Sequence, residues 1–198
     1  LISSVLHMRG EEVVAQPLSN ERFVFAFNGE IYEGLGLSPS DSDTEALYSM
    51  LTTTEKSLWV EQLAGLKGPY AFFLLDLEEG VLYFTRDPLG RRSLVYSITE
   101  GGFFLSSVSL PLEGLPCHEV TVEGLFSLSL DLSEPAPALF APWVPEGTIQ
   151  LARSPPISNC FTTESVEGTF RRLLREAVHR RVVCAPAVPI GVLFSGGL

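Results

Sequence analysis

The sequence is poor in cysteine and lacks a cysteine pattern that would fit a known site. Its 198 residues include three Cys, at positions 117, 160 and 184. An odd number cannot all be paired, and the spacing of Cys117, Cys160 and Cys184 fits neither a zinc site nor a disulfide framework. These residues also contain no Asn-x-Ser/Thr site and no signal-peptide pattern. We therefore expect a reducing compartment, cytosol or nucleus, and predict a cytoplasmic location.

Basic residues and long apolar runs are also scarce. Lys and Arg number 13 against 24 Asp and Glu, a net charge of −11. Residues 164–198 carry a net charge of +2, so residues 1–163 carry −13. An acidic domain of this kind argues against nucleic acid or an anionic membrane as partner. The longest apolar runs, Phe23–Phe27 and Tyr70–Leu75, are strand-sized and far shorter than the roughly 20 residues of a membrane span.

Apolar residues are nevertheless abundant, at 45% with 13 Phe, which predicts a folded core. Short apolar segments bounded by turn residues predict strands. The expected strands are Arg22–Phe27, Tyr70–Asp76, Val81–Thr85, Ser93–Ile98, Phe103–Ser107, Val120–Val122 and Leu125–Leu130. Several are apolar at successive positions, as in strands covered on both faces.

Two helices are expected between the first of these strands and the rest. One starts at a cap formed by Ser42 or Asp43, and the other runs from Glu55 to Ala64. Strands, then helices, then a series of hairpins predict an α+β domain with layered, mainly antiparallel sheets.

The last third of the chain has a different character. Six prolines fall within residues 133–158, and apolar periodicity is lost, which predicts a linker over 133–162. A helix capped by Thr163 follows, and Ile190–Phe194 is expected to form a short buried strand. The helix carries five arginines, which form either a solvated face or a contact with the acidic domain or a nucleotide: Arg171, Arg172, Arg175, Arg180 and Arg181.

Asn28 and Gly29 are the most informative pair in the chain. At a strand end, an Asn amide and an unobstructed Gly N–H supply the donors of an oxyanion hole. Glu30 beside them can receive a cationic amine. An ordinary Asn-Gly turn is the alternative interpretation of the dipeptide.

Several short motifs occur in a fixed order around this pair, over most of residues 5–130. The set comprises Gln16-Pro17, Phe27-Asn28-Gly29-Glu30-Ile31-Tyr32, Ser42-Asp43-Thr44-Glu45, Gly68-Pro69-Tyr70 and Arg86-Asp87-Pro88-Leu89-Gly90. In this order they resemble the glutaminase domain of asparagine synthetases, a class II glutamine amidotransferase with an N-terminal-nucleophile fold. Val192–Leu198 is similar to the start of the ATP-pyrophosphate loop in the α/β synthetase domain of that family.

The resemblance implies particular roles. Asn28 and Gly29 would form the oxyanion hole, and Glu30 and Asp43 would bind the α-amino group of glutamine. Ser195, Gly196 and Gly197 would bind the pyrophosphate of ATP, which brings Mg in the whole protein, while no metal site is expected among the protein's own side chains. Glutamine and aspartate would be the substrates of a glutamine-hydrolysing, ATP-dependent ligase of asparagine biosynthesis. Homodimer formation stays open.

The sequence departs from that family in three respects. Residue 1 is Leu rather than the nucleophilic Cys, and the ATP loop stops at Leu198. Arg9 lies too close to Gln16 to correspond to the Arg with which the family binds the glutamine carboxylate. The family's Arg therefore has no clear match in this sequence. We therefore expect a fragment that does not hydrolyse glutamine by itself, divided into a glutaminase-like domain (1–132), a linker (133–162) and the start of an ATP-binding domain (163–198). The alternative is a catalytically inactive glutaminase fold that serves as a scaffold or binding module.

Overall fold

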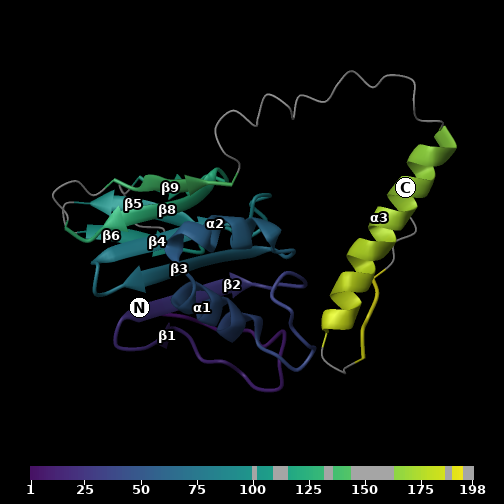
Figure 1. Cartoon of the computed structure of the whole chain (residues 1–198), viewed down its shortest axis with the longest axis horizontal. Helices are drawn as coiled ribbons and strands as arrows, with labels where there is room; N and C mark the ends of the chain where they lie inside the picture. The colour runs from purple at the N-terminus through teal and green to yellow at the C-terminus, as the bar shows by residue number, and fades with distance from the viewer. Residues whose placement is uncertain (100–101, 109–115, 132–135, 144–162, 186–188, 194–198) are drawn as a thin grey trace.

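The computed structural model of the chain describes residues 1–99, 102–108, 116–131, 136–143, 163–185 and 189–193 (Figure 1). The strands among these residues form two antiparallel sheets. In the larger sheet the strand order is β1-β2-β3-β4-β8-β9, and in the smaller sheet it is β6-β5-β7. The strands of the larger sheet are β1 (Leu18–Ser19), β2 (Phe23–Gly29), β3 (Tyr70–Asp76), β4 (Val81–Arg86), β8 (Gly124–Ser129) and β9 (Ala138–Pro142). Those of the smaller sheet are β5 (Val95–Thr99), β6 (Gly102–Ser106) and β7 (His118–Glu119).

Two helices cover one face of the larger sheet. Helix α1 (Asp43–Thr53) begins after Ser42, whose hydroxyl accepts a hydrogen bond from the Glu45 N–H. This settles which of the two expected residues caps the helix. Helix α2 (Lys56–Gly65) has Trp59 and Leu63 as its buried residues. The sequence predicted the start of α1 and both bounds of α2 to within one residue.

The core has two layers, one on each face of the larger sheet. Phe25 and Phe72 pack with Leu47 of α1 and Trp59 of α2 on the helical face. The opposite face contributes Ala71, Phe84 and Leu128, which pack against Leu94 and Val120, with Tyr96, Phe103 and Leu105 of the smaller sheet at the edge of the cluster. Because β3 is covered on both faces, its residues are apolar at successive positions, as the sequence pattern predicted. The layered α+β fold with mainly antiparallel sheets is therefore confirmed.

Three sequence expectations differ from the structure. Val120–Val122 is not a strand: Val120 is buried through its side chain, and β7 lies just before it at His118–Glu119. Strand β9 lies inside the range expected to be a linker, where it pairs with β8 and places Phe140 edge-on to Tyr83. Ile190–Phe194 is not a buried strand over its described residues 190–193, because Ile190 is 53% and Val192 82% exposed.

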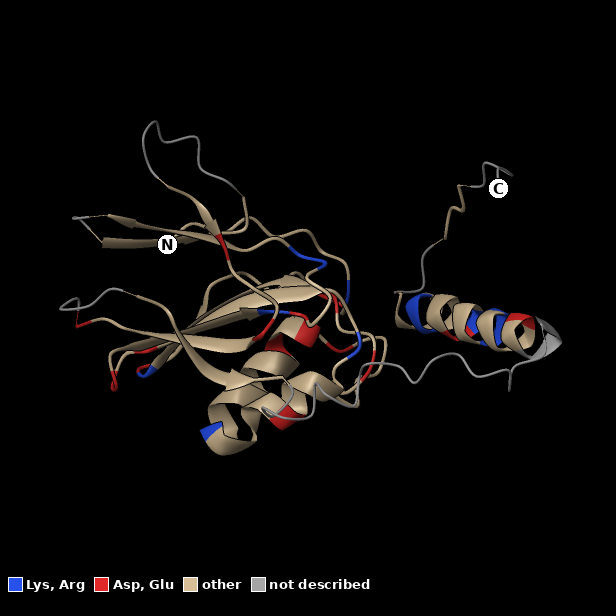
Figure 2. Ribbon diagram, turned by 90° about the horizontal axis from the view of Figure 1, so that it is seen from above, with Lys and Arg blue, Asp and Glu red and all other residues tan. Residues whose placement is uncertain are grey.

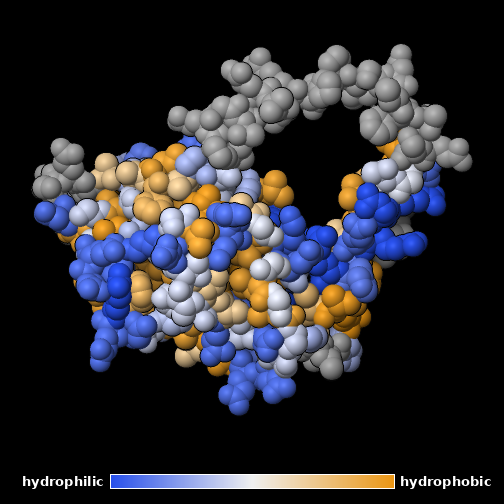
Figure 3. Space-filling model, in the orientation of Figure 1, coloured by the Kyte–Doolittle hydropathy of each residue, from blue (hydrophilic) through white to orange (hydrophobic). Residues whose placement is uncertain are grey.

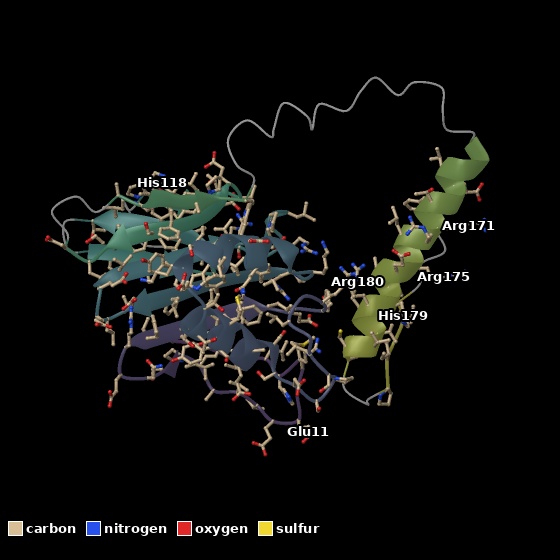
Figure 4. The ribbon with its side chains drawn as sticks, viewed as in Figure 1. Glu11, His118, Arg171, Arg175, His179 and Arg180 are labelled. Atoms are coloured by element: carbon tan, nitrogen blue, oxygen red, sulfur yellow. The ribbon has the colours of Figure 1, made fainter. Side chains whose placement is uncertain are left out.

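Helix α3 (Thr163–Cys184) lies beside the sheet domain and touches it near one end (Figures 1 and 4). Arg180 Nε lies 2.9 Å from the Glu33 carboxylate, and the Arg181 guanidinium stands over the Tyr32 ring. The Cys184 thiol donates to the Tyr32 carbonyl oxygen at 3.1 Å. Arg171 and Arg172 instead form pairs with glutamates one turn away on the helix. The arginines thus divide between the two interpretations that the sequence left open.

Charged residues of both signs lie along α3, whereas the strands are mostly uncharged (Figure 2). Its apolar side chains are about half exposed, among them Val166, Phe170 and Leu173, and Figure 3 shows apolar surface on this part of the molecule. In the described part of the chain, none of the helices is long and apolar enough to cross a membrane.

Candidate functional site

The candidate site lies at the C-terminal end of β2. Phe23, Phe25 and Phe27 face the helical layer and are buried, so Asn28 projects from the opposite face of the strand. Its side chain is exposed, and among the described residues no hydrogen bond occupies its amide group. The amide N–H groups of Asn28 are therefore free to donate to a ligand.

The N–H of Gly29 points to the open edge of the sheet. Gly29 lies opposite Tyr70, whose own N–H and C=O are both bonded to Asp87 on the far side of β3. Glu30, the next residue, donates its N–H to the Pro69 carbonyl at 2.9 Å. Because successive N–H groups of a strand point to opposite sides, the N–H of Gly29 faces away from β3 and is not used in the ladder.

A glycine is required at position 29 by close backbone packing. A Cβ atom at this position would collide with the Pro69 carbonyl oxygen and would lie 2.7 Å from the Tyr70 Cα. Gly68 has the matching constraint, because its Cβ would collide with the Glu30 carbonyl oxygen. The two glycines allow the chain segments to cross closely just where the free N–H is presented.

Asn28 and Gly29 open onto a cavity of about 620 Å³ at this edge. The N-terminal segment 2–9, the end of β2, the first half of β3, the start of α1, the loop after β4 and the end of β6 surround it. Gln16 also lines it and accepts a hydrogen bond from the Phe27 N–H through Oε1 at 2.7 Å. A volume of this size is in the range of pockets that hold small molecules.

Asp43 is a buried carboxylate on the wall of the cavity, at the first turn of α1. Its Oδ2 accepts the N–H of Ile31 at 2.9 Å, which ties α1 to the segment that follows Gly29 and Glu30. Burial raises the pKa of Asp43, and this effect exceeds the opposing effects of the Ile31 N–H and of Arg9. An ionised Asp43 therefore gains from a cation placed beside it.

Glu30 is half-buried next to the cavity but is not one of the residues that line it. Burial raises the pKa of Glu30, Arg92 lowers it, and the nearby charge of Asp43 raises it further. The Arg92 guanidinium lies 3.9 Å from the Glu30 carboxylate. The resemblance pairs Glu30 with Asp43 as one binding site for an amino group, and in the structure the charge of Asp43 acts on Glu30.

Arg9 reaches the same region but is committed to the backbone. Its guanidinium donates to the Ile31 carbonyl at 2.8 Å, the Ser38 carbonyl at 2.9 Å and the Asp41 carbonyl at 3.2 Å. The side chain is buried and fixes the loop between β2 and α1. Its three nitrogens each have a partner before any ligand binds.

Asp87 and Arg86 organise the loop after β4. Asp87 is fully buried and accepts the N–H groups of Leu89 and Arg91, as expected of a turn-forming Asp. Arg86 is buried and donates through Nε to the Arg92 carbonyl at 2.6 Å. Sequence reasoning did not identify Arg92 as a site residue, because nothing in the Arg-Arg dipeptide signals that Glu30, 62 positions earlier, lies beside it.

Two sets of sequence expectations are not tested by this geometry. Ser195, Gly196 and Gly197, expected to bind ATP, lie outside the described residues. Within the described residues, no group of three or more His, Cys, Asp or Glu is arranged to hold a metal ion. Cys117 is exposed and no cysteine is among the described residues that line the cavity.

Helices on one face of a larger antiparallel sheet, a smaller sheet on the other face, and an Asn-Gly donor pair at a strand end define the class of glutaminase-type amidotransferase domains. The model of the family described as "Glutamine amidotransferase domain" matches residues 4–113, and the chain belongs to this family.

Curated relatives and a solved structure agree with this assignment. Asparagine synthetase domain-containing protein 1 of Gallus gallus is 35% identical over 132 residues, which cover 64% of this chain and 21% of the relative. The Homo sapiens protein of the same name is 36% identical over 132 residues, covering 64% and 20%. This chain thus spans about a fifth of the length of these relatives. A solved structure described as the allosteric regulatory enzyme of purine biosynthesis matches with a TM-score of 0.50 at 21% identity, over 64% of this chain and 31% of that one, and shows the shared fold.

Proposed function

We propose that the cavity at the end of β2 binds glutamine as the nitrogen donor of an amidotransferase reaction. The observation that carries the proposal is the convergence on one cavity of the free Asn28 amide, the free Gly29 N–H and the buried carboxylate of Asp43. Two N–H donors suit the oxygen of a tetrahedral intermediate, which becomes negatively charged as the amide is attacked. A carboxylate with a raised pKa suits the ammonium group at the other end of the substrate.

Each residue of the site would have a defined part in this reaction. Asn28 and Gly29 would stabilise the negative oxygen, Asp43 with Glu30 would hold the α-ammonium group, and Gly68 would permit the close crossing that keeps Gly29 in place. No described residue of the cavity wall is a cysteine, so these residues would bind the substrate and stabilise charge without supplying the nucleophile.

Calorimetric titration of the chain with L-glutamine tests the proposal. We expect binding that weakens about 10-fold or more in Asp43→Asn, because the ammonium loses its buried counter-charge. Glu45→Gln is the matched control, since Glu45 is an exposed carboxylate two residues further along α1 and should leave the affinity unchanged. Absence of glutamine binding by the unmodified chain, or equal affinities of both variants, would contradict the proposal.

For the whole protein we propose transfer of the glutamine amide nitrogen to aspartate at the expense of ATP, with Ser195, Gly196 and Gly197 at the ATP phosphates and a cytoplasmic location. This finer assignment rests on the family resemblance and on relatives named for an asparagine synthetase domain. ATP with Mg would activate the acceptor carboxylate. Incubation of the whole protein with amide-¹⁵N-glutamine, aspartate and Mg-ATP should yield ¹⁵N-asparagine by mass spectrometry.

A scaffold without glutaminase activity is the second candidate. It is favoured by the Arg92–Glu30 pair, which places a cation where the substrate ammonium would compete for Glu30. Under this alternative the whole protein would release no glutamate and form no labelled asparagine.

A further inference from the structure

We infer that Arg92 binds the α-carboxylate of the amino acid in the cavity and makes the site selective for a zwitterion. This inference rests on the proposed function, because it names the residue that recognises the second charged group of the same substrate. It assigns to Arg92 a role for which the sequence offered no clear match.

The backbone at Arg92 is fixed independently of any ligand. Its carbonyl accepts the Arg86 Nε at 2.6 Å, and Arg86 is itself buried. The preceding residue, Arg91, donates its N–H to buried Asp87 at 2.9 Å. Two buried residues on β4 and just after it therefore hold this loop at the cavity, which is the support that a positioned binding group needs.

The guanidinium of Arg92 has N–H donors that no described residue uses. Its side chain lines the cavity and is 37% exposed, and its Nε is buried with no partner among the described residues. The 3.9 Å separation from Glu30 exceeds the roughly 2.7–2.9 Å of a charge-assisted hydrogen bond. Arg92 is thus near a carboxylate without being saturated by it, and its planar fork suits a second carboxylate.

Arg9, the other arginine among the described residues of the cavity wall, is not free in the same way. Each of its three nitrogens donates to a backbone carbonyl of the loop 31–41. Turning the guanidinium to a ligand would break the buried bond to the Ile31 carbonyl and leave that carbonyl without its partner. Arg9 therefore serves the loop, and Arg92 is the guanidinium that a ligand can engage.

The charges around the cavity then match an α-amino acid. Asp43 and Glu30 provide negative charge for the ammonium, and Arg92 provides positive charge for the carboxylate. When Glu30 binds the ammonium group of the ligand, the ligand carboxylate would replace Glu30 as the counter-charge of Arg92. A substrate that lacks the carboxylate would leave the guanidinium without its second partner, so it should bind about 10- to 100-fold more weakly.

Calorimetric titration with L-glutamine and L-glutaminamide, which has an uncharged amide in place of the α-carboxylate, tests this inference. The unmodified chain should prefer glutamine by about 10- to 100-fold. Arg92→Ala should lose that preference and bind the two compounds with similar affinity. Arg171→Ala is the matched control, because Arg171 is an exposed arginine on α3 and its removal should keep the preference (Figure 4).

Circular dichroism during thermal unfolding establishes that each variant is folded. Arg92→Gln, which keeps a polar side chain of similar length without the charge, gives a second test and should also lose most of the preference. Glutamine binding with an unchanged preference in both Arg92 variants would overturn the inference and leave the proposed function standing. No glutamine binding by the unmodified chain would instead overturn the proposed function.

Discussion

The backbone N–H of Ile31 donates to the carboxylate of Asp43 at 2.9 Å. This bond joins the segment after β2 to the first turn of α1, so the donors at residues 28 and 29 and the acidic group at residue 43 are held in one frame. The Ile31 carbonyl accepts from Arg9 on its other side. Ile31 thus has both backbone polar groups fixed, and its side chain is fully buried.

Replacing Asn28 by Ala should lower glutaminase turnover far more than glutamine affinity. The amide donor acts on charge that develops only as the intermediate forms, and removal of one such donor costs roughly 100-fold or more in rate. Glutamate release by the whole protein and calorimetric affinity measured side by side would show this split. Asn28→Asp, which removes the donor and adds negative charge, should lose at least as much, and a rate unchanged in either variant would exclude Asn28 from the oxyanion hole.

Gly29→Ala should destabilise the domain by about 1–3 kcal/mol or more, because the new Cβ would meet the Pro69 carbonyl. Gly65→Ala is the control, since no heavy atom lies within 4 Å of its Cβ position at the end of α2. That change should leave stability unchanged or raise it by up to about 1 kcal/mol. Urea unfolding measures both, and equal stabilities of the two variants would contradict the close crossing.

Asp43→Asn should make the fold more stable at neutral pH while weakening the site. The folded state raises the pKa of Asp43 above its usual 3.8, so the folded chain retains a proton that the unfolded chain has lost. The free energy of unfolding of the unmodified chain therefore falls as the pH rises through this interval, and the Asn variant escapes that fall. Urea unfolding from pH 4 to 7.5 should show the two curves diverging, whereas Glu45→Gln should stay parallel to the unmodified chain.

Asp76 has the opposite dependence on pH. Burial alone would raise its pKa, but hydrogen bonds from Arg22 and Lys56 prevail and lower it to about 2. The stabilisation of the folded state by ionised Asp76 is fully present well above pH 3.8 and is lost as the pH falls toward 2. Asp76→Asn should therefore cost about 2 kcal/mol at pH 7, about half of that at pH 3, and little at pH 2. Exposed Asp131→Asn, which should change little at either pH, is the control in the same denaturation series.

The sequence predicted the strands and helices best where local pattern and burial agree. Tyr70–Asp76 coincides with β3, and Val81–Thr85 differs from β4 by one residue, because apolar runs covered on both faces have sharp polar ends. Val120 misled the prediction since its side chain is buried while its N–H bonds to the Leu94 carbonyl outside the strands. Burial and strand pairing are separate properties, and a short apolar run does not distinguish them.

The site was predictable to the extent that it is local. Asn28 and Gly29 are adjacent in sequence, and the structure places both on the cavity together with Asp43. The roles of Arg9 and Arg92 depend on contacts across 22 to 62 positions of the chain, with Ile31 and Glu30 respectively. Sequence spacing carries no information about such contacts, which arise only when the loops are brought together by the sheets.

The contact of α3 with Tyr32 and Glu33 has a mechanical consequence. The C-terminal turns of the helix form an ion pair and a hydrogen bond with a segment that begins three residues after Gly29. A ligand that displaces this segment must therefore also break these contacts. By thermodynamic reciprocity, whatever anchors the helix would then tune the affinity of the distant pocket by the same factor.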